Sequence, residues 1–257
     1  MPGLGESTAP SPRLYFAYGS NLWLKQMATR CPSSWYVGRA VLPDYRWQIN
    51  ERGFANIVPA SGFAVHGLVY ELGADDEPRL DRSEGVPSGA YTKAYKPVIL
   101  HTAPAALRLS TRRLVEGGDP ARRESISTRG PDAYLQPNVL VYLSENYVQD
   151  GRARDEYVDR MNSGIRDGIS MGIPRDFFEN AVRKSIPNRP ALRKVNQQVN
   201  RHSRTTSQTP IIITPRRAQS AEGRRPAWPS ESYTSWGVWQ QRYQAPRYGQ
   251  RSPGYHY

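Results

Sequence analysis

The alternation of apolar and polar positions predicts a series of short strands separated by turns. Strand-like spacing occurs at residues 13–17, 35–42, 45–50, 55–58, 65–72, 91–100 and 139–143. The clearest of these segments is 65–72, which is rich in valine, leucine and tyrosine. Proline, aspartate and glycine interrupt the pattern at Pro43-Asp44 and at residues 59–62, which predicts turns there.

Segments with helical spacing accompany these strands. Residues 22–30 have apolar residues at helical positions, and residues 74–85 begin with aspartates that can cap a helix and end at Gly85. A helix over 155–171 is predicted by an apolar stripe of Tyr157, Met161, Ile165 and Ile169. Pro174 opens a further helix that stops before Pro187. Strands followed by helices predict an α+β fold, a small mixed-sheet or barrel domain.

The net charge of +12 belongs to the C-terminal part of the chain. Residues 183–257 contain 14 lysines and arginines against only Glu222 and Glu231, so the preceding residues are neutral overall. The charge therefore says nothing about the ligand of the folded part. Composition predicts a disordered N-terminus at 1–12, one domain at 13–186 with a charged loop at 117–133, and a basic disordered tail at 187–257.

Several classes of protein are disfavoured by what the sequence lacks. It contains no run of about 18 apolar residues and no basic-then-apolar start, which predicts neither a membrane-spanning helix nor a secretory signal. The single cysteine, Cys31, fits a reducing compartment, and we expect a cytoplasmic protein. Cys31 is interpreted as a buried thiol rather than a nucleophile. The four histidines have no metal-binding spacing, so no metal site is predicted.

The segment from Tyr15 to Leu22 combines a strand, a glycine turn and the start of a helix. Backbone N–H groups at such a junction point toward one spot and can bind a carboxylate or phosphate. The alternative is an ordinary Gly19-Ser20-Asn21 turn between two core elements. On these eight residues alone, the ordinary turn is the favoured interpretation, because short motifs are weak signals.

Further blocks follow this segment in a definite order. Together they are Leu14-Tyr15-Phe16-Ala17-Tyr18-Gly19-Ser20-Asn21-Leu22, Val65-His66-Gly67-Leu68-Val69-Tyr70, Leu80-Asp81-Arg82-Ser83-Glu84-Gly85-Val86, Ser88-Gly89-Ala90-Tyr91 and Tyr142-Leu143. Their order and spacing strongly resemble the gamma-glutamylcyclotransferase (AIG2-like) family over roughly residues 13–182. The resemblance implies a six-stranded β-barrel flanked by helices. It also implies an enzyme that releases 5-oxoproline from γ-glutamyl amino acids without a cofactor.

The resemblance assigns the catalytic role to Glu84. Attack by the α-amine of a γ-glutamyl group on its own γ-carbonyl needs no side-chain nucleophile, but it needs an anchor and a proton carrier. The Tyr18–Leu22 turn can anchor the α-carboxylate through backbone amides. Glu84 lies at the end of the predicted 74–85 helix, where the helix dipole raises its pKa. The alternative is a solvated residue at a helix end beside Asp81 and Arg82.

The resemblance also implies a set of substrate-binding residues. They are Tyr15, Phe16, Ala17, Tyr18, Gly19, Ser20, Asn21, Leu22, Tyr91 and Tyr157. Tyr157 could equally be a core aromatic on its apolar stripe. Tyr91 could hydrogen-bond to the substrate or to Glu84, or simply fill a strand face. The leaving group can be an amino acid, an amine or the remainder of glutathione, and an amino acid is favoured.

The C-terminal tail offers a second function of a different class. Its arginines alternate with aromatic residues and could bind single-stranded nucleic acid by charge and stacking. The favoured interpretation is a solvated disordered arm, because low-complexity basic segments are often disordered. The alternative function is therefore a non-catalytic binding module that carries this tail. The sequence contains no signal for the oligomeric state.

Overall fold

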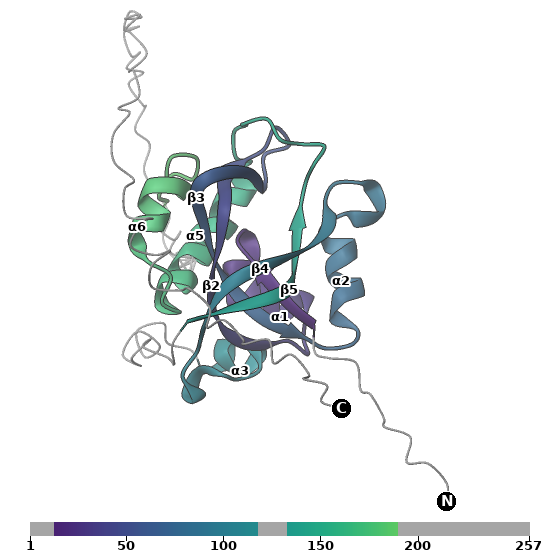
Figure 1. Ribbon diagram of the computed structural model, residues 1–257, viewed down its shortest axis with the longest axis vertical. Helices are drawn as coiled ribbons and strands as arrows, with labels where there is room; N and C mark the ends of the chain where they lie inside the picture. Colours follow the sequence, from purple (N-terminus) through teal and green to yellow (C-terminus); the bar gives the residue numbers. More distant parts are fainter. Residues whose placement is uncertain (1–12, 118–132, 190–257) are drawn as a thin grey trace, which may run out of the picture. The chain divides into compact units, whose positions relative to one another are not determined.

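The computed structural model describes residues 13–117 and 133–189, and in this part of the chain five strands close into a barrel (Figure 1). The strands are β1 (Arg13–Ala17), β2 (Trp35–Ile49), β3 (Ala55–Leu72), β4 (Thr92–Thr102) and β5 (Tyr134–Leu143). Their order around the barrel is β1-β3-β2-β4-β5. Neighbouring strands are antiparallel except β1 and β5, which meet in parallel at Tyr15 and Leu140 and close the barrel. The predicted α+β barrel is confirmed, but the strand number is five rather than six.

The sequence indicated seven strand-like segments, whereas the described residues form five strands, because two turn-like stretches lie inside long strands. β2 runs through Pro43-Asp44, and β3 runs through residues 59–62. Asp44 has a positive φ of 59° and is skipped in the ladder between the Pro43–Ala64 and Tyr45–Pro59 pairs. Its carboxylate accepts a hydrogen bond from the Gly62 N–H at 3.1 Å. The ladder is therefore irregular here, with one residue skipped on β2 and residues 60–63 skipped on β3, but neither strand ends.

Helices flank the barrel, with α5 and α6 on one side and α2 on the other (Figure 1). The α-helices are α1 (Leu24–Arg30), α2 (Asp76–Ser83), α3 (Thr111–Glu116), α5 (Asp155–Ser170) and α6 (Arg175–Phe177). Short turns of other helix types are η1 (Ser20–Leu22), η2 (Val86–Ser88), η3 (Ala105–Leu107) and η4 (Phe178–Val182). Gly85 takes the left-handed conformation after α2, as its position predicted. No helix within the described ranges has both the length and the apolar character needed to span a membrane.

Close packing of α5 against η1 positions the turn that follows β1. A Cβ on Gly164 would lie 3.1 Å from the Leu22 Cβ, which is tighter than most such contacts, so a larger residue here would push against the turn. The amide of Leu24 at the start of α1 donates to the Asp167 carboxylate at 2.9 Å. Along the predicted apolar stripe of α5, Tyr157, Met161 and Ile165 are buried. The α5 helix thus holds Tyr157 against the turn.

Three predictions concern residues that lie almost entirely outside the described ranges. They are the disordered N-terminus at 1–12, the charged loop at 117–133 and the basic tail at 187–257. The predicted domain boundaries and the proposed role of the tail therefore stay predictions.

Candidate active site

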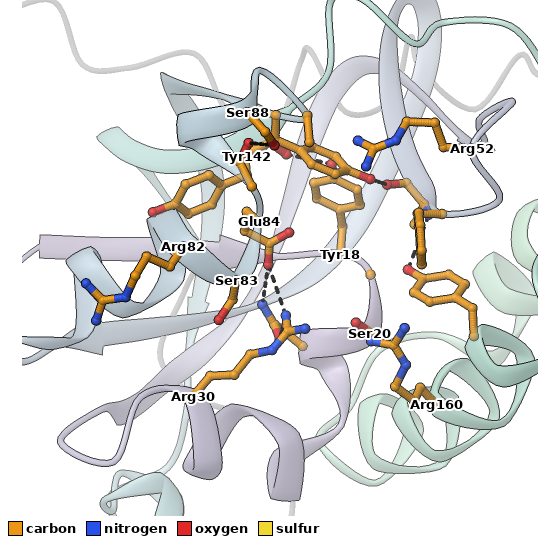
Figure 2. A pocket seen from close by; sticks show the side chains of 18 of the residues that line it. Tyr18, Ser20, Arg30, Arg52, Arg82, Ser83, Glu84, Ser88, Tyr142 and Arg160 are labelled. Carbon is orange, nitrogen blue, oxygen red and sulfur yellow. Dashed lines mark hydrogen bonds and ion pairs between the residues drawn. The ribbon is translucent and has the colours of Figure 1, made fainter.

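A cavity of about 290 Å³ lies where the turn after β1, the end of α2 and the first turn of α5 meet. It brings together residues that are far apart in the sequence (Figure 2). Glu84 lines it, together with most of the predicted substrate-binding residues: Tyr15, Tyr18, Gly19, Ser20, Asn21, Tyr91 and Tyr157. Phe16, Ala17 and Leu22 do not line it. These three have no exposed surface and belong to the hydrophobic core, so they support the turn from behind.

Glu84 follows the last residue of α2 and turns its carboxylate toward the segment after β1. Its Oε1 accepts hydrogen bonds from Asn21 Nδ2 at 3.0 Å and from Arg30 Nη1 at 3.2 Å. The second oxygen, Oε2, is turned away from Arg30 (Figure 2). Only 17% of the side chain is exposed, which excludes the alternative of a solvated residue at a helix end.

The surroundings of Glu84 act on its pKa in opposite directions. Burial raises the pKa of the carboxyl group, because the ionised form loses its contact with water. The charge of Arg30, the hydrogen bond from Asn21 and the charge of Arg160 lower it, but the net direction is upward. The direction of the predicted shift is confirmed. Its main cause is burial, whereas the sequence had suggested the helix dipole.

Asn21 is the centre of the network that orients Glu84. Besides its bond to Glu84, its Nδ2 donates to the Tyr15 hydroxyl at 2.9 Å. Its Oδ1 accepts from Gln26 Nε2 at 3.0 Å and from Arg30 Nη1 at 2.9 Å. Asn21 is only 3% exposed, and these bonds fix the direction of its amide. The Glu84 carboxylate is therefore held in one orientation by neutral and charged donors.

Two tyrosine hydroxyls meet the backbone of Ala55 at the start of β3. Tyr91 donates to the Ala55 carbonyl at 2.6 Å, and Tyr157 accepts from the Ala55 amide at 3.3 Å. The Tyr91 hydroxyl therefore does not bond to Glu84, which was one of its predicted alternatives. Tyr157 is both a core aromatic and a cavity residue, and burial raises its pKa to about 12. Both hydroxyls stay protonated at neutral pH.

The helix amides that were predicted to anchor a carboxylate already have partners. The amides of Leu22 and Trp23 donate to the carbonyls of Gly19 and Ser20, at 3.0 and 3.1 Å. The amide of Leu24 donates to the Asp167 carboxylate. An anchor on this turn must therefore come from the earlier residues, Gly19 to Asn21, which face the cavity.

Comparison with known proteins supports the resemblance seen in the sequence. A model of the family described as "Gamma-glutamyl cyclotransferase, AIG2-like" matches residues 15–109. The gamma-glutamylcyclotransferase of Mus musculus is 36% identical over 181 residues, which are 66% of this chain and 88% of the mouse protein. The chain belongs to the gamma-glutamylcyclotransferase family.

Further relatives agree with this assignment. The Bos taurus gamma-glutamylcyclotransferase is 34% identical over 88 residues, which are 30% of this chain and 47% of the bovine protein. A solved structure described as "Gamma-glutamyl cyclotransferase" has a TM-score of 0.50 at 22% identity, covering 73% of this chain and 95% of that one. This similarity shows that the fold is shared. Since the gamma-glutamylcyclotransferases are enzymes, the prediction of an enzyme of this family is confirmed.

The family motifs contain only one of the arginines that give the cavity its positive charge, Arg82. Four arginines line the cavity, namely Arg30, Arg52, Arg82 and Arg160, whereas Glu84 is its one acidic residue. Two of the other arginines lie in predicted helices and could have been placed near the site: Arg30 ends the predicted 22–30 helix, and Arg160 lies almost one turn after Tyr157. The position of Arg52 could not have been predicted, because it lies between two strands with no periodic pattern around it.

Cys31 and His66 do not line the cavity. Cys31 is buried among apolar residues outside the cavity, and burial raises the pKa of its thiol, as expected of an unreactive cysteine. His66 lies on β3 with its ring 5.0 Å from that of Phe177, and burial lowers its pKa to about 4. No group of histidine, cysteine or acidic side chains suited to a metal ion occurs within the described residues.

Proposed function

We propose that this cavity catalyses the cyclisation of a γ-glutamyl compound to 5-oxoproline, with Glu84 as the general acid and base. The main observation behind the proposal is the hydrogen bonding of the Glu84 carboxylate. Asn21 and Arg30 hold one oxygen, and the second oxygen accepts no hydrogen bond from the part of the chain that the structure describes. A carboxylate that is fixed but keeps one open oxygen can exchange a proton with a substrate in the cavity.

The glutamyl group binds between the turn and Glu84. Its α-carboxylate lies against the backbone of Gly19 to Asn21, and the Tyr15 and Tyr18 side chains also line the cavity. This placement brings the α-ammonium group next to Glu84. It also folds the five-atom chain so that the nitrogen approaches the γ-carbonyl carbon, which supplies most of the entropic advantage of an intramolecular reaction.

Proton transfer to Glu84 starts the reaction. The carboxylate takes a proton from the α-ammonium group, and the lone pair that is released attacks the γ-carbonyl carbon, forming the new C–N bond and an oxyanion. Glu84 must therefore be ionised in the resting enzyme. The charge of Arg30 and the hydrogen bond from Asn21 favour this ionised form against the effect of burial.

Return of the proton completes the reaction. The protonated Glu84 donates to the nitrogen of the leaving group as the oxyanion collapses and the old C–N bond breaks. Over the whole reaction the attacking nitrogen loses two protons and the leaving nitrogen gains two. One carboxylate that carries protons in this direction satisfies both needs, and a pKa raised by burial makes it a better donor.

The experiment that tests this function compares a substrate with its amine-blocked analogue. Purified protein is expected to convert γ-glutamyl-alanine to 5-oxoproline and alanine in equal amounts, and to leave N-acetyl-γ-glutamyl-alanine intact. In water enriched in oxygen-18, the 5-oxoproline is expected to carry no label, because no water attacks the carbonyl. Glutamate as the product, or turnover of the acetylated compound, would show hydrolysis instead and contradict the proposal.

A further inference from the structure

Arg52 is a cavity residue for which the proposed reaction provides no role. It lies in the turn between β2 and β3 and lines the cavity. Its Nη1 is buried and has no hydrogen-bond partner among the described residues. A buried donor on a charged group is costly when it is left unpaired, so its burial here calls for an explanation.

The other arginines of the cavity differ from Arg52 in this respect. Arg30 is paired with Glu84 at 3.2 Å, and Arg160 with Glu156 at 2.8 Å. Arg82 is exposed to solvent. Within the part of the chain that the structure describes, Arg52 forms no ion pair. Its guanidinium group is therefore the one that combines partial burial with an uncompensated charge.

Contacts around Arg52 hold its guanidinium group ready for a ligand. The guanidinium carbon lies 4.8 Å from the centre of the Tyr147 ring and 6.0 Å from that of Phe54, within the range of cation–π attraction. The backbone is fixed as well, since its amide donates to Asn50 Oδ1 at 3.1 Å and its carbonyl accepts from Arg154 Nε at 2.9 Å. Figure 2 shows the guanidinium group directed into the cavity, away from the side that Arg30 occupies.

We infer that Arg52 binds a carboxylate group on the leaving part of the substrate and is a specificity-determining residue. A carboxylate matches the planar guanidinium and compensates a positive charge that has no ion-pair partner among the described residues. This inference rests on the proposed function, because that function places the glutamyl group beside Glu84.

A γ-glutamyl amino acid has two carboxylates, and the position of Arg52 relative to Glu84 indicates which of the two Arg52 binds. The glutamyl carboxylate is attached to the carbon that bears the attacking amine, so it must stay near Glu84. Arg30, which pairs with Glu84 at 3.2 Å, lies on the opposite side of the cavity from Arg52 (Figure 2). Arg52 therefore faces the part of the substrate that extends away from Glu84, which is the leaving amino acid.

The test compares γ-glutamyl-alanine with γ-glutamyl-alaninamide, in which the leaving carboxylate is replaced by an amide. Wild-type enzyme is expected to favour the acid. Arg52→Gln is expected to lower kcat/KM for the acid by about 10- to 100-fold, the range for a hydrogen bond to a charged group, and to leave the amide unaffected. Arg52→Lys keeps the charge without the planar fork and is expected to retain part of the preference. Arg112→Gln, which removes an exposed arginine on α3, is the control and is expected to change neither value.

Two outcomes would overturn the inference. Equal losses on the acid and the amide would show that Arg52 supports the fold or holds the glutamyl carboxylate, and no loss on either would show that it binds neither. A second measurement separates this inference from the proposed function. The dissociation constants of both compounds for Glu84→Gln protein, with and without Arg52→Gln, do not depend on turnover. If Arg52 sets the preference for the acid in binding although the wild-type enzyme forms no 5-oxoproline, the proposed function fails and this inference stands; no such preference in binding would refute the inference.

Discussion

At the scale of single residues, the surroundings of Glu84 act on its ionisation in opposite directions. Burial opposes ionisation, while Arg30 and Asn21 favour it. The motif that contains Glu84 could be recognised from the sequence, because its residues are contiguous. The balance that sets its pKa could not, since Asn21 and Arg30 lie 63 and 54 positions away in the chain. Arg52 was missed for a similar reason, because nothing local distinguishes it from a surface arginine.

Replacement of Arg30 tests this balance directly. Arg30→Gln removes the positive charge that favours the ionised form of Glu84, so the pKa of Glu84 should rise further. Since the carboxylate must be ionised to accept a proton, the acidic limb of the profile of kcat/KM against pH is expected to move to higher pH. Arg30→Lys keeps the charge and should leave the limb closer to that of the wild type. A limb that stays in place, or moves to lower pH in Arg30→Gln, would contradict the account.

At the scale of elements, the site depends on how α5 packs against the turn after β1. The apolar stripe that predicted α5 was a reliable signal, because sixteen residues give several repeats of the helical period. The long strands were harder to predict, since Pro43-Asp44 has the composition of a turn although Asp44 lies at a register shift within β2. The helix α3 was missed altogether, because its six residues are too few to show a period.

A larger residue at Gly164 tests the packing of α5. Gly164→Val would place side-chain atoms against Leu22, where a Cβ alone comes within 3.1 Å, and α5 would have to move away from the turn. We expect a loss of about 1–3 kcal/mol in the free energy of unfolding, measured with urea, together with a lower kcat/KM as Tyr157 shifts. Arg166→Val, at an exposed position on the same helix, controls for the effect of valine on the helix itself. Equal stability of the two variants would refute the tight contact.

At the scale of the whole molecule, the fold brings distant segments to one cavity. These include the turn after β1, the turn between β2 and β3, the end of α2 with the residues up to Tyr91 that follow it, and the N-terminal part of α5. The sequence predicted the elements and their order well enough to predict a barrel, because alternation and helical period are local signals. It did not predict the grouping of four arginines at the cavity or the hydrogen bond from the Leu24 amide to Asp167, because those depend on which elements come together. The net positive charge of the chain is no guide to this cavity, since it arises in residues 183–257.

The most direct test of the account is the rate of 5-oxoproline release from γ-glutamyl-alanine by Glu84→Gln protein. Glutamine keeps the size of the side chain and an oxygen that can accept from Asn21, but it cannot carry a proton at neutral pH. The account predicts a kcat about 10²- to 10⁴-fold below that of the wild type, with the protein still folded, and an unchanged kcat for Glu145→Gln at an exposed position outside the cavity. A folded Glu84→Gln enzyme with the wild-type kcat would contradict it.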